Sequence, residues 1–280
     1  MSNKFDAARQ NKLAEDFRAL HHRDEMLVLV NAWDSASARM VQEAGLPAIA
    51  TTSSGISWAC GFKDGEHIPP DLMIEVVRQI ASSVTIPVSA DIEAGYYGND
   101  LEQFSKFIEK LIEAGAVGIN LEDSDSKTHT LVDVAKHVAK VKQAKKTGHD
   151  KGVNLFVNAR TDAIELALGD INQKIQACIE RAKAYEEAGA DGIFIPFVEG
   201  MDTIARLKAG VRLPLNILMN DTLDVAGLRR LKINRVSVGG KPMLATLNLV
   251  GKIAQELKSE DDWHSLYVKE PIYPTVNNWF

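Results

Sequence analysis

The chain has 280 residues, of which 45% are hydrophobic and 25% are charged, and its formal net charge is -6 at pH 7. This balance is typical of an ordinary globular protein, and the length suits two domains or a single α/β barrel of about 250 residues. We find no basic face that could neutralise phosphates, so we expect no nucleic-acid partner.

The start of the chain is polar and contains Asp6, Glu15 and Asp16. It lacks the apolar core of a signal peptide, and its acids argue against an organelle transit peptide. No stretch reaches the roughly 18 apolar residues of a membrane span. The two cysteines, Cys60 and Cys178, form no disulfide framework and no metal signature. We therefore expect a cytoplasmic protein with no membrane partner.

Short apolar runs recur along the chain, each rich in Val, Ile or Leu. They span 26–33, 47–55, 86–91, 117–123, 154–160, 192–197, 213–220 and 234–240. Each run is too short for a helix and has the composition of a parallel strand buried on both faces. Longer amphipathic segments, such as 100–116 and 172–190, lie between them. This alternation predicts an α/β fold, namely a (β/α)8 barrel of the TIM type. An open doubly wound sheet is the alternative, but no G-x-G-x-x-G follows any strand, so a dinucleotide site is disfavoured.

We expect one domain over 1–280, with additions at both ends of the barrel. A helix at about 3–21 precedes a core at about 25–258. The tail, 259–280, is rich in aromatic residues, so we expect it to pack on the barrel or on a partner subunit.

The triplet Glu-Ala-Gly occurs at 43–45, 113–115 and 187–189, each time just before a predicted strand. A glycine suits the left-handed residue that commonly ends a helix. Chance recurrence in Ala- and Glu-rich helices explains three such positions less well than a shared helix-to-strand junction does.

Polar side chains gather at the ends of the predicted strands. They are Asn31, Trp33, Asp34, Thr52, Ser53, Ser54, Asp91, Glu93, Glu122, Asp123, Asn158, Arg160, Asp162 and Asn216. Barrel active sites form at the C-terminal ends of the strands. A barrel built for packing alone has no need of a ring of acids around one arginine, so we expect catalysis or binding there.

Two of these carboxylates, Asp91 and Glu93, lie two residues apart at the end of the third strand, so both face the same way. Glu122, from the neighbouring strand end, can converge on them. Three carboxylates at one place repel one another unless a divalent cation lies between them, and oxygen ligands favour a hard ion. The sequence predicts a Mg2+ site, with Ca2+ or Mn2+ as alternatives. The competing explanation is that an acid caps the next helix, which suits Asp100 better than Asp91.

Arg160 is the natural counter-charge, because Asn158, Arg160 and Asp162 alternate on one face of the fifth strand. A guanidinium can hold a carboxylate or phosphate by two parallel hydrogen bonds. The alternative is an internal salt bridge to Asp162 or Glu122. Asn216, in the seventh strand, is a further candidate for substrate binding.

The stretch "TTSSGIS", at 51–57, ends the second strand in small residues. Backbone N–H groups near Gly55 could bind an anionic oxygen, although such turns are common. The loop that follows, 58–71, contains Asp64 and Glu66, and it could cover the barrel mouth as a lid. We interpret Cys60 in this loop as a small buried residue rather than as a nucleophile.

At these motifs the chain resembles the isocitrate lyase and phosphoenolpyruvate mutase superfamily. The matching stretches are "NAWDSASARMVQEAGLPAIATTSSGIS" (31–57), "GFKDGE" (61–66), "PVSADIEAGYYGN" (87–99), "GAVGINLEDS" (115–124) and "FVNARTDA" (156–163). The likeness runs from about Asn31 to Gly240.

The resemblance implies that Asp91 binds Mg2+, while Glu93, Glu122 and Asp64 hold the water ligands of the ion. It also implies roles toward substrate. The turn Ser54, Gly55 and Ile56 matches the one that binds the substrate carboxylate, and Arg160 matches the arginine beside it. We therefore expect Arg160, Asp64 and Glu122 to be the catalytic residues.

The departures from the family pattern lie after the fourth strand. Lyases of the isocitrate and methylisocitrate type carry a Lys-Arg-Cys-Gly-His loop there, whereas this chain reads "EDSDSKTHTLVD" at 122–133, with no cysteine. The phosphonomutase branch carries a Lys and an Asn in its lid, which Lys127 and His129 match only loosely.

The resemblance implies a Mg2+-dependent lyase that acts on a small 2-oxo acid or related dicarboxylic acid through a metal-bound, pyruvate-like enolate. Phosphorus–carbon chemistry, by a phosphoenolpyruvate mutase or a phosphonopyruvate hydrolase, is the alternative. A barrel that binds small acids without turnover is a third.

The segment 244–257 has apolar residues at helical spacing, and an aromatic tail follows it. Such a helix normally closes its own barrel. The tail residues Trp263, Tyr267, Tyr273, Trp279 and Phe280, however, make a large aromatic surface to leave in water. Members of the resembled family often exchange this helix between subunits and form tetramers. We expect a homo-oligomer, a dimer of dimers, held partly by 241–280.

Overall fold

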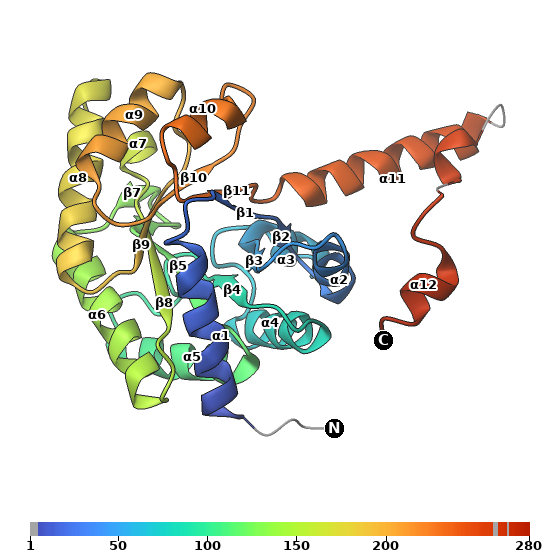
Figure 1. The fold of residues 1–280 in the computed structure, drawn as a ribbon, viewed down its shortest axis with the longest axis horizontal. Helices are drawn as coiled ribbons and strands as arrows, with labels where there is room; N and C mark the ends of the chain where they lie inside the picture. Colours follow the sequence, from blue (N-terminus) through green and yellow to red (C-terminus); the bar gives the residue numbers. More distant parts are fainter. Residues whose placement is uncertain (1–4, 260–262, 268) are drawn as a thin grey trace.

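The computed structural model describes residues 5–259, 263–267 and 269–280 and contains a closed parallel barrel (Figure 1). Its strands are β1 (Leu27–Leu29), β2 (Asn31–Ala32), β3 (Ile49–Thr51), β4 (Val88–Asp91), β5 (Gly118–Glu122), β8 (Phe156–Arg160), β9 (Gly192–Ile195), β10 (Leu215–Leu218) and β11 (Arg235–Ser237). β1 and β2 are two halves of one strand, interrupted at Val30. Since β1 pairs with β11 and β2 pairs with β3, the sheet closes on itself. The predicted TIM-type barrel is confirmed, and each of its strands lies within a predicted apolar run.

Helices surround the barrel in the order that the sequence predicts. They are α2 (Ser35–Glu43), α4 (Pro70–Ser83), α5 (Leu101–Ala114), α6 (Val134–Asp150), α8 (Ile171–Glu187), α9 (Met201–Gly210) and α10 (Val225–Arg230). Short helices α3 (Ser53–Ala59) and α7 (Ala163–Leu166) lie in the loops at the strand ends, and an antiparallel hairpin of β6 (Ser124–Asp125) and β7 (Thr130–Leu131) follows β5. Among the described helices, none is long and apolar enough to cross a membrane.

Helix α5 illustrates why these segments fold as they do. The Asp100 carboxylate accepts hydrogen bonds from the backbone N–H groups of Glu102 and Gln103, at 3.1 and 3.0 Å, so the predicted cap is present. Its apolar side packs into the core. The helix ends at Gly115, with φ 109°, where a Cβ would also lie 2.6 Å from Ala81 Cβ. The glycines of the other two Glu-Ala-Gly triplets have φ 81° and 96°, so the predicted junctions are confirmed.

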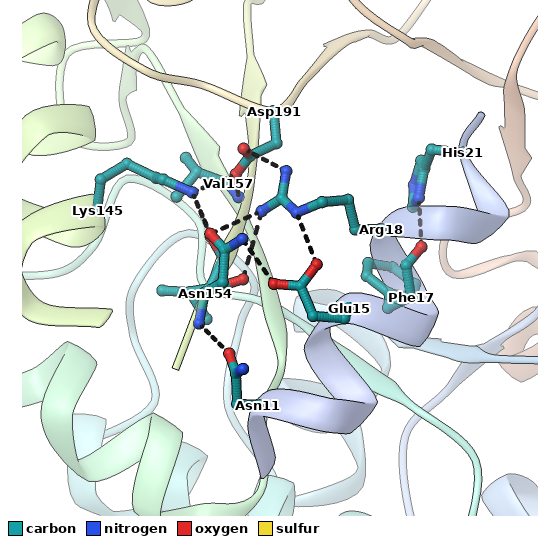
Figure 2. A network of polar contacts seen from close by, with 10 residues as sticks. Asn11, Glu15, Phe17, Arg18, His21, Lys145, Asn154, Val157 and Asp191 are labelled. Carbon is teal, nitrogen blue, oxygen red and sulfur yellow. Dashed lines mark hydrogen bonds and ion pairs between the residues drawn. The ribbon is translucent and has the colours of Figure 1, made fainter. Parts of the chain in front are cut away.

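The N-terminal helix α1 (Ala7–Leu20) closes the bottom of the barrel, and a network of polar contacts ties it there (Figure 2). Arg18 of α1 pairs with Asp191 at 2.6 Å, and Asp191 also accepts from Lys145 and from the backbone of Val157, both at 2.8 Å. Asn154 joins the network through Arg18 at 3.1 Å. Three segments distant in sequence are therefore locked together below the sheet.

His21, just after α1, is buried in the same region. Its Nδ1–H donates to the Phe17 carbonyl at 2.8 Å, and its ring stacks on Phe156 with centroids 4.1 Å apart. Burial, with the positive charges of Arg235, His22 and Arg18 nearby, lowers the pKa of His21 to about 3. The imidazole is therefore neutral in the folded protein at pH 7.

We predict that the free energy of unfolding falls as the pH drops from about 6.5 to about 3. In that window the unfolded chain binds a proton that folded His21 cannot, and the loss reaches about 5 kcal/mol at most. Above pH 6.5 the contribution is fully present. Urea unfolding at several pH values measures it. His21→Phe should flatten the slope, whereas the control His22→Phe, at an exposed position, should leave it unchanged. An equal slope in both variants would assign the acid sensitivity to other groups, such as buried His137.

The C-terminal segment leaves the barrel. Helix α11 (Lys241–Ser259) projects away from the sheet in Figure 1, and the short helices η1 (His264–Leu266) and α12 (Tyr273–Asn277) follow it outside the barrel. η1 packs on α11, since Ser265 donates to Glu256 through its N–H and Oγ–H, at 2.9 and 2.7 Å. In the single chain, α11 therefore does not close its own barrel, as an eighth helix normally would.

Candidate active site

The predicted acids meet at the C-terminal ends of neighbouring strands. Asp91 ends β4, Glu122 ends β5 and Arg160 ends β8, and Glu122 and Arg160 are paired in register across β5 and β8. Asp91 is paired in register with Asn120 of β5. Parallel pairing thus gathers residues that are up to 69 positions apart (91 and 160) at one rim of the barrel.

Asp91 is held by hydrogen bonds to its side chain and to its backbone. Its Oδ2 accepts from Ser53 Oγ at 3.1 Å and from Ser53 N–H at 3.3 Å, and its own N–H donates to Thr51 Oγ1 at 2.9 Å. Among the described residues, none makes a hydrogen bond to Oδ1. One carboxylate oxygen is thus fixed by the protein while the other is left for a ligand.

Glu93 belongs to an interlock of three residues, all with left-handed backbones. Glu66, Glu93 and Tyr96 have φ of 60°, 53° and 65°. The Glu66 N–H donates to Glu93 Oε2 at 2.6 Å, and the Tyr96 N–H donates to Glu66 Oε1 at 2.5 Å. Such conformations are costly outside glycine and concentrate at functional sites. The interlock joins the loop before α4 to the loop after β4.

Arg160 makes internal salt bridges to Asp162 and Glu122, which the sequence analysis gave as the alternative to substrate binding. Its Nη1 lies 2.6 Å from Glu122 Oε2, and its Nε and Nη2 donate to the two Asp162 oxygens at 2.7 and 3.1 Å. These contacts use three of the five N–H donors of a guanidinium. Arg160 is therefore rigidly oriented, and two donors remain for a substrate.

The site carries an excess of negative charge. Burial and then the carboxylates of Asp64, Glu122 and Asp91 raise the pKa of Glu93 to about 9. Burial also raises the pKa of Glu122, although Arg160 opposes it, and burial and Asp91 raise that of Asp64. Four mutually repelling carboxylates fit a divalent cation, which would remove the cost of ionising them together.

The acids do not form a ready direct ligand set. In the part of the chain that the structure describes, no three His, Cys, Asp or Glu side chains are arranged to hold one ion between them. Both Glu122 oxygens are engaged, Oε1 by Ser124 Oγ and Oε2 by Arg160 Nη1, and Glu93 accepts from the Glu66 N–H through Oε2 and from the Tyr96 hydroxyl, at 3.5 Å, through Oε1. That Asp91, Glu93 and Glu122 bind a metal stays a prediction, and contact through water suits Glu93 and Glu122 better than direct ligation.

The predicted anion-binding turn forms the first turn of α3. Thr52 caps the helix, and its Oγ1 lies 3.0 Å from Ser54 Oγ. A Cβ on Gly55 would lie 2.6 Å from Thr52 Cγ2 and 3.0 Å from Trp33 Cβ, so only glycine fits. Gly55 and Ile56 are buried, and their N–H groups donate to Thr52, to Oγ1 at 3.4 Å and to the carbonyl oxygen at 3.0 Å. Ser54, Gly55 and Ile56 do not line the cavity at the barrel mouth, so their substrate-binding role stays a prediction.

Asn216 and Cys60 lie elsewhere than the sequence suggested. Asn216 is 1% exposed, in the middle of β10, where its Oδ1 accepts from Ser237 Oγ at 3.3 Å. It does not line the cavity at the barrel mouth. Its substrate-binding role stays a prediction without geometric support. Cys60 is half-buried rather than buried, and it does not line that cavity either.

A cavity of about 350 Å3 lies at this rim. Its walls are Ser53, Asp64, Gly65, Glu93, Glu122, Ser124, Asp125, Ser126, His129, Arg160, Asp162, Glu165, Leu166 and Phe197. The predicted lid loop supplies Asp64 and Gly65, and the β6–β7 hairpin supplies His129. Phe197, with φ 59°, places its ring 5.7 Å from the Arg160 guanidinium carbon. Lys127, on the same hairpin as His129, does not line this cavity.

The sequence listed Asp123 among the rim acids but did not reveal its role. Asp123 is fully buried and accepts from Tyr185 OH at 2.6 Å, Arg181 Nη1 at 2.9 Å and Asp162 N–H at 3.0 Å. It therefore anchors the residue that orients Arg160. The signal in the sequence was weak, since Arg181 and Tyr185 are ordinary helix residues four positions apart.

The fold and the rim define the class: a (β/α)8-barrel protein with a cavity lined by acids at the C-terminal ends of its strands. The family model described as phosphoenolpyruvate phosphomutase matches residues 17–258, so the chain belongs to this family. It lies within the isocitrate lyase and phosphoenolpyruvate mutase superfamily, which the motifs predicted.

Among its relatives, an uncharacterised protein of Mycobacterium tuberculosis is 35% identical over 231 residues, 82% of this chain and 84% of that one. Relatives with assigned activities include 2-methylisocitrate lyases and oxaloacetate decarboxylases, which are 25–28% identical. The superfamily thus comprises lyases and mutases, and these relatives differ in substrate.

Solved structures share the fold. A Burkholderia cenocepacia protein described as a candidate phosphonomutase has a TM-score of 0.83 and 38% identity, covering 88% of this chain and 100% of that one. A phosphonopyruvate hydrolase, solved with oxalate and Mg2+, has a TM-score of 0.83 and 22% identity, covering 95% and 94%.

Proposed function

We propose that this protein is a Mg2+-dependent carbon–carbon lyase that acts on a small 2-oxo acid or a related dicarboxylic acid through a pyruvate-like enolate. The observation that carries the proposal is the excess of carboxylates around one fixed arginine at the barrel rim. Asp91 would hold the ion directly, and Asp64, Glu93 and Glu122 would hold it through water. When bound, Mg2+, or Mn2+ in its place, would stabilise negative charge that develops on oxygen.

The residues of the chain have separate tasks in this scheme. Arg160 would bind the substrate carboxylate with the two donors that Glu122 and Asp162 leave free, and its fixed position means that no reorganisation is needed during the reaction. The turn at Ser54, Gly55 and Ile56 would take part in binding the same carboxylate only if its N–H groups exchanged their bonds to Thr52 for the substrate. Phe197 and the hairpin would exclude water from the cavity.

Phosphorus–carbon chemistry is the second candidate. It is favoured by the 38% identity to the candidate phosphonomutase and by the absence of a cysteine in 122–133. Incubation with phosphonopyruvate and with C4 and C5 2-oxo or 2-hydroxy dicarboxylic acids, in the presence of Mg2+, separates the candidates. Release of inorganic phosphate or formation of phosphoenolpyruvate would favour the second, whereas pyruvate formed from a dicarboxylic acid would favour the first. Ligand binding without turnover of either class would favour a non-catalytic binder.

We predict that oxalate, which has the geometry of a pyruvate enolate, raises the melting temperature only when Mg2+ is present. At a concentration about 100 times its dissociation constant, a ligand adds about 2.7 kcal/mol to the free energy of unfolding. Arg160→Lys keeps the charge but loses the forked geometry, so it should remove most of the effect. Arg78→Lys, at a position on α4 whose side chain is 43% exposed, is the matched control. An equal rise without metal would contradict the enolate proposal.

We also propose that the chain forms a homo-oligomer, a dimer of dimers, through α11 and the tail. Helix α11 exposes four apolar side chains by 43–56% in the single chain, namely Leu244, Leu247, Leu249 and Val250. In the tail, Tyr273 is 81% exposed. An isolated helix with such a face is unfavourable in water, and burial against a second copy would remove that cost.

A cytoplasmic location stays a prediction.

A further inference from the structure

The interior of this barrel is unusually polar below the acids. In TIM barrels the lumen is mostly filled by bulky branched side chains. Here the buried positions of the strands include Ser89, Asn120, Asn158, Asn216 and Arg235. Asn158 donates to Asn120 Oδ1 at 2.8 Å, which joins two strands across the lumen wall.

Arg235 is the charged member of this layer, and it is 0% exposed. Its Nη2 donates to Asn120 Oδ1 at 3.3 Å, and its guanidinium carbon lies 5.9 Å from the centre of the Phe17 ring. Its Nε and Nη1 have no hydrogen-bond partner among the described residues. Arg235 comes from β11, and β5 lies on the opposite side of the closed sheet, so the side chain spans the lumen.

Arg235 also differs in its pairing from Arg160 and Arg18, which are half-buried. Arg160 and Arg18 each contact carboxylates at 2.6 Å. In the described part of the chain, no carboxylate lies within 4.0 Å of Arg235, the limit for an ion pair. An unpaired buried cation costs several kcal/mol unless a field of opposite sign compensates it.

That field comes from the rim acids above it. Asn120, the bonding partner of Arg235, is the register partner of Asp91. The Asp91 carboxylate is the acid that acts on the charge of Arg235. Burial lowers the pKa of Arg235 to about 9, which leaves it charged at neutral pH. The positive charge therefore lies beneath Asp91, inside the barrel, where water does not screen it.

We propose that Arg235 is a positioning residue that acts through Asp91: a fixed internal cation that stabilises the acid cluster without metal and thereby weakens its affinity for a divalent cation. This proposal rests on the metal site in the proposed function. A bound ion and Arg235 compete for the same negative charge, and both are positive. Removing the arginine charge should therefore tighten metal binding, the opposite of what lost structural support would do.

Titration calorimetry with Mg2+, and with Mn2+ followed by its electron paramagnetic resonance signal, tests the proposal on the full chain. Arg235→Met should bind either ion about tenfold more tightly than the parent chain. Arg235→Lys, which keeps the charge, should bind as the parent does. Arg18→Met removes a barrel-bottom charge that Asp191 already neutralises, so it should leave the affinity unchanged.

Arg235→Gln, which can still bond to Asn120, replaces the Met variant if that variant does not fold by circular dichroism. Equal or weaker metal binding in the neutral variants would overturn the inference. So would the same tightening in Arg18→Met. Absence of any metal binding by the parent chain would instead overturn the proposed function, so the two failures are distinguishable.

Discussion

Asp91→Ala will weaken Mg2+ binding by at least about 100-fold and abolish metal-dependent binding of oxalate, because it removes the strand-end carboxylate whose Oδ1 accepts no hydrogen bond from the described residues. The fold should persist. Asp91 is one of several acids that repel one another, so its removal costs little and could raise the metal-free melting temperature. Calorimetry with Mg2+ and thermal melting measure the two effects.

Asp125→Asn is the matched control for this experiment, because Asp125 lines the same cavity but is placed to cap its own hairpin turn. Its Mg2+ affinity should stay within a few-fold of that of the parent. Metal-dependent binding that survives in Asp91→Ala would show that Asp91 is not the ligand.

Removal of α11 and the tail will dissociate the protein. Light scattering of the intact chain should give a tetramer at micromolar concentration. A chain cut after Gly240, which lacks α11, should give dimers or monomers, and a cut after Lys258, which spares most of α11, should have a smaller effect. The reason is that, among the described residues after Gly240, most of the exposed large aliphatic side chains lie on the helix itself.

A point variant tests the exposed face of α11 without shortening the chain. Leu247→Glu places a charge on the exposed face of α11 and should dissociate the assembly, whereas Leu168→Glu, at a residue 93% exposed on the barrel, should not. A monomeric intact chain would exclude the assembly. An unchanged oligomer after the cut at Lys258 would show that the tail has no role in the assembly.

The barrel could be predicted because each strand is an apolar run between amphipathic helices, and that pattern depends only on neighbours in sequence. The β6–β7 hairpin could not, since Ser124–Asp125 and Thr130–Leu131 are too short for an alternating pattern. The departure of α11 from the barrel was expected only from the family resemblance, since the residue pattern alone fits a helix that closes its own barrel. Its apolar positions say that one face is buried, but not whether the barrel or another subunit buries it.

The candidate site divides in the same way. Asp91, Glu122 and Arg160 were predictable because they end strands that parallel pairing brings together. The interlock of Glu66, Glu93 and Tyr96 was not, because left-handed residues other than glycine carry no sequence signal. The polar lumen around Arg235 was missed because a single arginine in an apolar run gives no direction for its side chain.

The interlock has a mechanical consequence. The backbone of Glu66 lies in the loop that borders the cavity, and its N–H is the donor that neutralises part of the Glu93 charge. Swinging that loop outward would break this bond and strip Glu93 of its donor at the same moment. Opening of the cavity to small molecules and release of an ion by the acids would then occur in the same loop movement. A chain whose loop is tethered in place should therefore exchange both its ligand and its ion slowly.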